Sequence, residues 1–161
     1  MALGDNTLAS ARGNTQRGRN PYMVQTTLNW ATALSDKGSA LAASDVVPVI
    51  AVPKGTMVLN AGIEVDTATD GSTFTVDLGT GVDPDVFVDG FDATSAAAVV
   101  AQNPAAYQPV MAVADDNIDV TIATLSGGAV TSGKFRVWAV LMDCTDIGDM
   151  AANEVDRDTL A

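Results

Sequence analysis

The sequence predicts an all-β protein, an antiparallel β-sandwich of jelly-roll-like type with an extended N-terminal arm. Three observations support this fold class. Apolar and polar residues alternate with period two in several segments of strand length. Gly-, Pro- and Asp-rich turn signals separate these segments. No amphipathic pattern of ten or more residues lies between them, although a parallel α/β fold would need such crossover helices.

The first half of the chain contains four predicted strands. Residues 24–34, which include Trp30, form the first, and residues 45–52 the second. Pro48 has no backbone N–H, so residues 45–52 should form an edge strand or contain a bulge. In the third strand, residues 57–65, the alternation predicts an apolar face of Met57, Leu59, Ala61, Ile63 and Val65.

The segment Ala68-Thr69-Asp70-Gly71 predicts a hairpin turn, since Asp-Gly suits a type I′ turn. It should join the third strand to a fourth at residues 73–78. In this fourth strand the side chains that point toward the core are Phe74, Val76 and Leu78.

The second half contains an aspartate-rich loop (81–92), then an alanine-rich segment (96–101) that could form one or two helical turns before Pro104. Strands are expected within residues 107–113, 118–122 and 134–142. In the last of these, Phe135, Val137, Ala139 and Leu141 share one face. The opposite face is unusually apolar for a surface, so another part of the chain or a partner subunit should cover it; it comprises Arg136, Trp138, Val140 and Met142.

The two ends of the chain carry opposite charge, which predicts three regions: a basic arm (1–20), a β-sandwich domain (21–143) and an acidic segment (144–161). The arm contains Arg12, Arg17 and Arg19 with little to bury, so it should be mobile in solution. It is either a solvated tail or an arm that folds onto an acidic neighbour, such as another copy of the chain. Likewise, the acidic segment is either solvated or complementary to that arm across a subunit boundary.

The composition excludes several classes of function. The chain of 161 residues has 20 Asp and Glu against 8 Lys and Arg, a net charge of -12 that repels nucleic acid. It has no histidine, which removes the commonest general base and metal ligand. No apolar run is long enough to span a membrane. We therefore expect no catalytic residue, no cofactor, and neither nucleic acid nor a membrane as a partner.

Cys144 and the aspartate-rich loop 81–92 are candidate functional sites, but each also has a purely structural explanation. Cys144 follows an apolar strand beside Asp143 and Asp146, which disfavour a reactive thiolate, so it should be an inert apolar residue. In the loop 81–92, Asp83, Asp85 and Asp89 could supply oxygen ligands to Ca²⁺. Their spacing does not match an EF-hand, and aspartates commonly stabilise turns, so the favoured prediction is that no metal binds.

Two segments carry a resemblance to a known family. Residues 49–59 (Val-Ile-Ala-Val-Pro-Lys-Gly-Thr-Met-Val-Leu) and 74–85 (Phe-Thr-Val-Asp-Leu-Gly-Thr-Gly-Val-Asp-Pro-Asp) resemble small virion proteins of tailed bacteriophages, specifically capsid cement (decoration) proteins. The resemblance covers residues 45–142. It implies a β-sandwich that forms a trimer or a dimer and clamps neighbouring major-capsid subunits. It supplies no catalytic residues.

The family resemblance implies a virion protein that is assembled in the host cytoplasm. The net charge of -12 suits a place on the outer capsid surface, since the packaged interior is already anionic. The major capsid protein and further copies of the chain are then the expected partners, with a trimer favoured over a dimer. We expect Arg12, Arg17, Arg19, Arg136 and Trp138 at the interfaces. The alternatives are a tail-tube, head-completion or host-recognition component, or a carbohydrate-binding module built on the aromatic residues Trp30, Phe87, Phe91 and Tyr107.

Overall fold

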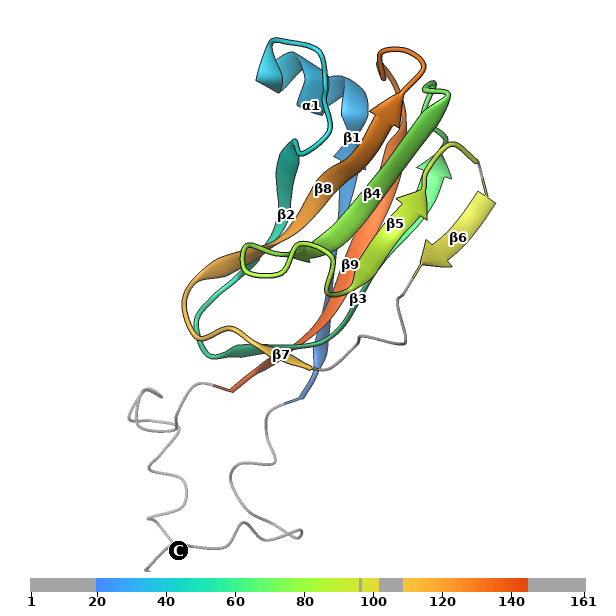
Figure 1. Cartoon of the computed structure of the whole chain (residues 1–161). Helices are drawn as coiled ribbons and strands as arrows, with labels where there is room; N and C mark the ends of the chain where they lie inside the picture. The colour runs from blue at the N-terminus through green and yellow to red at the C-terminus, as the bar shows by residue number, and fades with distance from the viewer. Residues whose placement is uncertain (1–19, 96, 102–108, 145–161) are drawn as a thin grey trace, which may run out of the picture.

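The computed structural model describes residues 20–95, 97–101 and 109–144 (Figure 1). Within them, the structure has nine strands and one helix, and the strands form two packed sheets. In chain order these are β1 (Tyr22–Asn29), α1 (Trp30–Lys37), β2 (Val46–Val52), β3 (Thr56–Thr67), β4 (Thr73–Thr80), β5 (Val88–Asp92), β6 (Ala97–Ala101), β7 (Val110–Met111), β8 (Asp116–Ser126) and β9 (Lys134–Asp143).

The strand order is that of a jelly roll. The first sheet has the order β1-β9-β3-β6, with β7 also paired to β3, and the second has the order β2-β8-β4-β5. All of the pairings are antiparallel. The chain passes back and forth between the sheets, so that strands near its two ends lie side by side, as in the double Greek key. The predicted all-β, jelly-roll-like sandwich is therefore confirmed.

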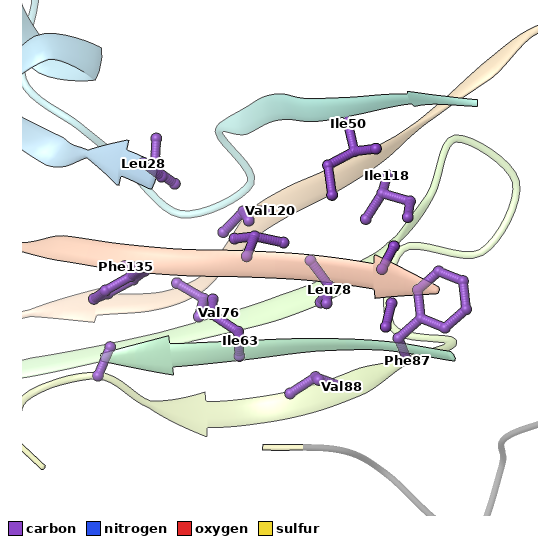
Figure 2. Close-up of a cluster of buried hydrophobic side chains, with 14 of the residues drawn as sticks. Leu28, Ile50, Ile63, Val76, Leu78, Phe87, Val88, Ile118, Val120 and Phe135 are labelled. Atoms are coloured by element: carbon purple, nitrogen blue, oxygen red, sulfur yellow. The ribbon is translucent and has the colours of Figure 1, made fainter. Parts of the chain in front are cut away.

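The core lies between the two sheets, where their inner faces meet (Figure 2). The predicted inward positions of β4, β8 and β9 are all buried, among them Phe74, Ile122 and Phe135. Trp30 closes one end of this core, with its ring centroid 5.0 Å from that of Phe74 and 5.5 Å from that of Phe135, both edge-to-face. Such aromatic pairs add to the hydrophobic stabilisation of the core.

The prediction that residues 24–34 form one strand is wrong beyond Asn29. Strand β1 ends there, and α1 begins at Trp30 because the Asn29 side chain accepts a hydrogen bond from the Ala31 N–H at 3.0 Å, which is a helix N-cap. Gly38 then ends the helix in the left-handed conformation, with φ of 68°. The alternating pattern missed this cap, and Trp30 enters the core from the helix rather than from a strand.

The predicted hairpin between residues 57–65 and 73–78 is also wrong. Strand β3 belongs to the first sheet and β4 to the second, so the chain crosses the sandwich between them. Asp70 does not sit in a type I′ hairpin turn. Its Oδ1 accepts hydrogen bonds from the backbone N–H groups of Thr131, at 2.8 Å, and Ser132, at 3.1 Å. The carboxylate thus ties this crossover to the loop before β9.

Bulges decide which residues of β2 and β3 face the core. The pairing of β2 with β8 shifts register between Pro48 and Ile50, and β2 is an edge strand, so both parts of the prediction for Pro48 are confirmed. In β3 a second shift occurs between Val58 and Asn60. Because of it, Val58 is buried, whereas Met57 and Leu59, which were predicted to face the core, lie outside it.

Two further predictions concern residues 96–113. The alanine-rich segment was considered able to form one or two helical turns, but Ala97–Ala101 form β6, which pairs with β3 and extends the first sheet. In the predicted strand 107–113 only Val110–Met111 are extended, as β7, and residues 107 and 108 lie outside the described residues. No helix in the described part of the chain is long and apolar enough to cross a membrane.

The described residues include nearly all of the predicted sandwich domain (21–143). The arm (1–20), apart from Asn20, and the acidic segment (144–161), apart from Cys144, lie outside them. The described ends of the chain are close together because Tyr22 pairs with Leu141. Both ends lie at the same end of the sandwich as β7 (Figure 1).

Candidate interaction surface

The outer face of the first sheet carries a continuous apolar area. Side chains alternate along each strand, so residues between the core positions of β1, β9, β3 and β7 point away from the core. The register aligns three of the four methionines in one row across β7, β3 and β9 and places the fourth beside Val140. We call this area the methionine face; it comprises Met23, Met57, Met111, Trp138, Val140 and Met142.

The methionine face is accessible. Met23 is 61% exposed and Met111 41% exposed. The other four residues are half-buried, and none of the six belongs to the core or packs against it. Within the described ranges, therefore, no segment of the chain seals this face. The face contains all four methionines that the structure describes.

Trp138 lies on β9, the middle strand of this face, opposite Gly62 of β3. A Cβ atom at position 62 would lie only 2.5 Å from Cζ2 of Trp138. The indole therefore lies against the Gly62 backbone, in space that any other residue would fill. The glycine lets a large aromatic side chain lie low on the sheet and leaves part of it exposed.

Arg136 lies beside Trp138 on the outer side of β9, but it is already partnered. Its Nη1 is 2.9 Å from Oε2 of Glu64, the residue opposite it on β3. The Arg136 side chain is 43% exposed and that of Glu64 21% exposed. This cross-strand ion pair borders the methionine face on the side away from the chain ends.

The outer face of the second sheet has the opposite character. It carries Asp77 on β4, Asp89 and Asp92 on β5, and Asp119 on β8, which together we call the aspartate face. Burial raises the pKa of Asp77, and the charges of Asp89 and Asp85 raise it further. No lysine or arginine in the described part of the chain forms an ion pair with these four carboxylates.

The pKa values of Asp119 and Asp92, also on this face, are shifted by nearby groups. Burial, and then the charge of Asp116, raise the pKa of Asp119. The Thr94 backbone N–H and hydroxyl donate to Oδ1 of Asp92 at 2.9 and 2.7 Å, and these bonds lower the pKa of Asp92. The aspartate face is therefore a surface of concentrated negative charge.

The three aspartates considered for calcium lie at different places in this region. Asp83 and Asp85 are in the loop after β4, and a hydrogen bond to the Asp85 side chain raises the pKa of Asp83. Asp89 is on β5, where its charge acts on Asp77. Among the described residues, no three acidic or cysteine side chains gather in a way that could hold a metal ion.

The structure places the remaining candidates as follows. Cys144 is half-buried, and its backbone N–H donates to the Gly55 carbonyl at 2.8 Å. Of the aromatic residues considered for carbohydrate binding, Trp30 and Phe87 are fully buried and Phe91 packs against the core. Tyr107, Arg12, Arg17 and Arg19 lie outside the described residues.

Half of the methionine face could be predicted from the sequence. Trp138, Val140 and Met142 alternate on the apolar outer side of residues 134–142. Met23, Met57 and Met111 could not be predicted, because their places depend on which strands pair and on the bulge in β3. The available signal was that Met57, Met111 and Met142 each fall in a predicted strand.

No family model matches this chain, and no curated protein matches it significantly. Solved structures do share its fold. It is similar to a chain of the cyanophage Pam1 capsid asymmetric unit, with a TM-score of 0.59 at 15% identity, covering 88% of this chain and 96% of that chain. It is also similar to a chain from the capsid of Ralstonia phage GP4, with a TM-score of 0.55 at 16% identity, covering 79% of this chain and 86% of that chain. At these identities the likeness shows a shared fold.

Proposed function

We propose that this protein is a non-enzymatic structural component of a phage virion. In this proposal it decorates the outer capsid surface and stabilises the shell by bridging neighbouring major-capsid subunits. It acts as a homo-oligomer, a trimer in preference to a dimer. The shared fold with chains of two phage capsids supports the virion role.

The observation that carries the proposal is the methionine face. Large exposed apolar areas on soluble proteins are typical of surfaces that bind another protein. Methionine and tryptophan are enriched in such interfaces, and methionine adapts its shape to the partner. We assign this face to the major capsid protein, because the aspartate face on the other side of the sandwich suits exposure to solvent.

Bridging follows from having several such faces in one oligomer. A stable contact of standard size buries about 1,600 Å². When two or three copies are joined, binding of one methionine face raises the effective concentration of the others at adjacent sites. Modest contacts therefore add up to firm attachment across the boundary between capsid subunits.

The test is binding to purified, expanded phage shells that lack this protein. The double variant Met23→Asp/Met111→Asp places two carboxylates on the methionine face, at its two most exposed positions. Its matched control is Val46→Asp, at a residue that is 54% exposed on the edge strand of the other sheet. We expect wild type and the control to saturate shells at a fixed ratio, and the double variant to bind at least tenfold more weakly.

Thermal unfolding of all three proteins checks that the variants are folded, as expected for substitutions at exposed side chains. Equal binding by the double variant would reject the methionine face as the shell-binding surface. A wild-type protein that does not bind shells would contradict the decoration role. Hexameric rings would then favour a tail component, and binding to host cells or glycans a recognition component.

A further inference from the structure

A groove opens between the two sheets at the end of the sandwich where the described chain ends lie. Its volume is about 470 Å³. Val52, Val58 and Val110 from β2, β3 and β7 line it, together with the loops around Val82 and Val113. The last two side chains are 89% and 81% exposed, an unusual position for valine. The groove therefore offers an apolar site of the size of an aliphatic side chain or larger.

The wall of the groove is anionic. It includes Asp115 and Asp116. Oδ1 of Asp115 accepts a hydrogen bond from the Lys54 backbone N–H at 2.9 Å, and Oδ1 of Asp116 accepts from those of Gly81 and Asn117. No cation in the described part of the chain forms an ion pair with either carboxylate. An apolar site bordered by two carboxylates suits a segment that carries both aliphatic and cationic side chains.

This chain has one such segment, and it leaves the fold close to the groove. Tyr22, Leu141, Val58 and Val110 pair in one row across the first sheet. Two inter-strand spacings, about 10 Å, thus separate the start of β1 from Val58 in the groove lining. The 19 residues before Asn20 contain Leu3, Leu8 and three arginines, with Asp5 as their single acid.

The other end of the chain fits the groove poorly. The 17 residues after Cys144 leave from the same end of the sandwich, but they contain five acids against one arginine. Their charge repels Asp115 and Asp116, whereas that of the N-terminal arm attracts them. Charge complementarity therefore selects the arm as the occupant.

We propose that the groove binds the N-terminal arm, residues 1–19, of a neighbouring copy of this chain. Leu8 enters the apolar site, and Arg12 pairs with Asp115 and Asp116. Fully extended, the arm spans about 60 Å. A domain of this size is only about 35 Å across, so the arm reaches beyond its own domain. The inference rests on the proposed function for the presence of neighbouring copies.

An exchanged arm explains how copies could be joined while most of the methionine face stays free, since Met111 is the one residue of that face that lines the groove. Each copy gives one arm and receives another, which is a heterologous contact that closes into a ring when the rotation between copies fits. In such a ring the rest of each methionine face remains available to the shell. The two surfaces then have separate roles, oligomer formation and capsid binding.

The test is disulfide trapping between two differently tagged chains, both carrying Cys144→Ser. One chain carries Leu8→Cys and the other Val113→Cys. We expect mixing under mild oxidation to give covalent pairs that contain both tags. The matched control replaces Val113→Cys with Val46→Cys, which is also exposed but lies on the edge strand of the second sheet. The control should give at least tenfold fewer pairs.

A second measurement uses the chain without added cysteines. Arg12→Ala/Arg17→Ala/Arg19→Ala should lower the mass in solution from oligomer to monomer, with the largest difference from wild type at low salt. Trapping no greater than in the Val46→Cys control would overturn the inference. So would trapping that occurs only within one chain carrying both cysteines, since the arm would then bind its own groove.

Failure of this inference can be told apart from failure of the proposed function. Met23→Asp should keep the trapped pairs while weakening shell binding, because Met23 lies on the methionine face and does not line the groove. The triple arginine variant should bind shells as a monomer, more weakly than wild type because avidity is lost. Wild-type trapping without any shell binding would reject the decoration role and leave the arm contact standing.

Discussion

The outer faces of the two sheets occupy equivalent places in the jelly roll, yet they differ in chemistry. The first sheet presents methionines, Val140 and Trp138, and the second presents four aspartates. An antiparallel sheet that faces water on one side should alternate apolar-in with polar-out. The second sheet follows this rule and the first breaks it. The difference teaches that the outer side of β9 departs from the pattern of a solvated sheet face, and this departure supports the proposed role of the methionine face as a contact surface.

The position of β9 strengthens this interpretation. It pairs with both β1 and β3, so its outer side chains lie in the middle of the sheet. Buried apolar residues at an interface usually occupy its centre, with polar and charged groups at the rim. Here Trp138 and Val140 lie on the central strand, and the Arg136–Glu64 ion pair lies at one border. An apolar centre with a charged border is the pattern that the proposed contact surface requires.

The largest expected difference between the two sheets is in the stability lost when a glycine is replaced by alanine. In the second sheet, a Cβ at Gly79 would collide with the backbone of Asp83 and Pro84. That loop is fixed by the Thr80 N–H to Asp83 carbonyl bond and by the fully buried Phe87. We expect Gly79→Ala to lower the free energy of unfolding by about 3 kcal/mol or more, measured by urea denaturation.

Gly81→Ala is the matched control for this change. A Cβ there would meet only the side chain of Asp116, at 2.9 Å, which can move aside. It should cost clearly less than Gly79→Ala. Equal losses for the two variants would show that the loop after β4 does not pack rigidly over the aspartate face.

In the first sheet, Gly62→Ala should have a smaller effect on stability and a larger one on the surface. Its Cβ would meet the half-exposed Trp138 ring, which can tilt outward into solvent. We expect a loss of about 1–2 kcal/mol in the free energy of unfolding. The tryptophan emission should shift toward longer wavelength, while Trp30 stays buried. Trp138→Phe assigns the signal, and an unchanged emission maximum in Gly62→Ala would mean that Trp138 does not lie over Gly62.

The sequence was sufficient to predict the fold class and most of the core. Period-two patterns placed Phe74, Ile122 and Phe135 correctly, because strands buried on one face must alternate. It was insufficient wherever one local feature changed the pattern. The Asn29 side chain began a helix inside an apparent strand, and the bulge after Val58 moved Met57 and Leu59 off the core face. Asp70 bonded to a loop 61 residues further along the chain rather than to its own turn.

The candidate surface was predictable only where it lay on a single strand. Trp138, Val140 and Met142 alternate within residues 134–142, so their shared face could be predicted without knowing the partners of that strand. Met23 and Met111 join them through pairings between residues more than 50 positions apart. Such pairings depend on the topology, which local alternation does not encode.

The smallest predicted effect concerns charge on the aspartate face. Burial raises the pKa of Asp77, and the charges of Asp89 and Asp85 add to this, so its ionised form is less favourable in the folded protein than in the unfolded chain. Asp77→Asn should therefore stabilise the protein at pH 7. The amide oxygen can still accept the Gly90 N–H bond, which is 2.7 Å long in the wild type.

The pH dependence of the free energy of unfolding tests most directly whether the Asp77 charge destabilises the fold. The folded-state pKa of Asp77 lies above the ordinary 3.8, so its destabilising contribution is fully present above that raised value. It disappears as the pH falls below 3.8, where wild-type Asp77 is protonated in both states. The stability gain of Asp77→Asn over wild type, measured by urea denaturation, should shrink between pH 7 and pH 3. Asp66→Asn, at an exposed residue near the end of β3, is the control. A gain for Asp77→Asn that stays constant over this range would mean that its charge is not what weakens the fold on the aspartate face.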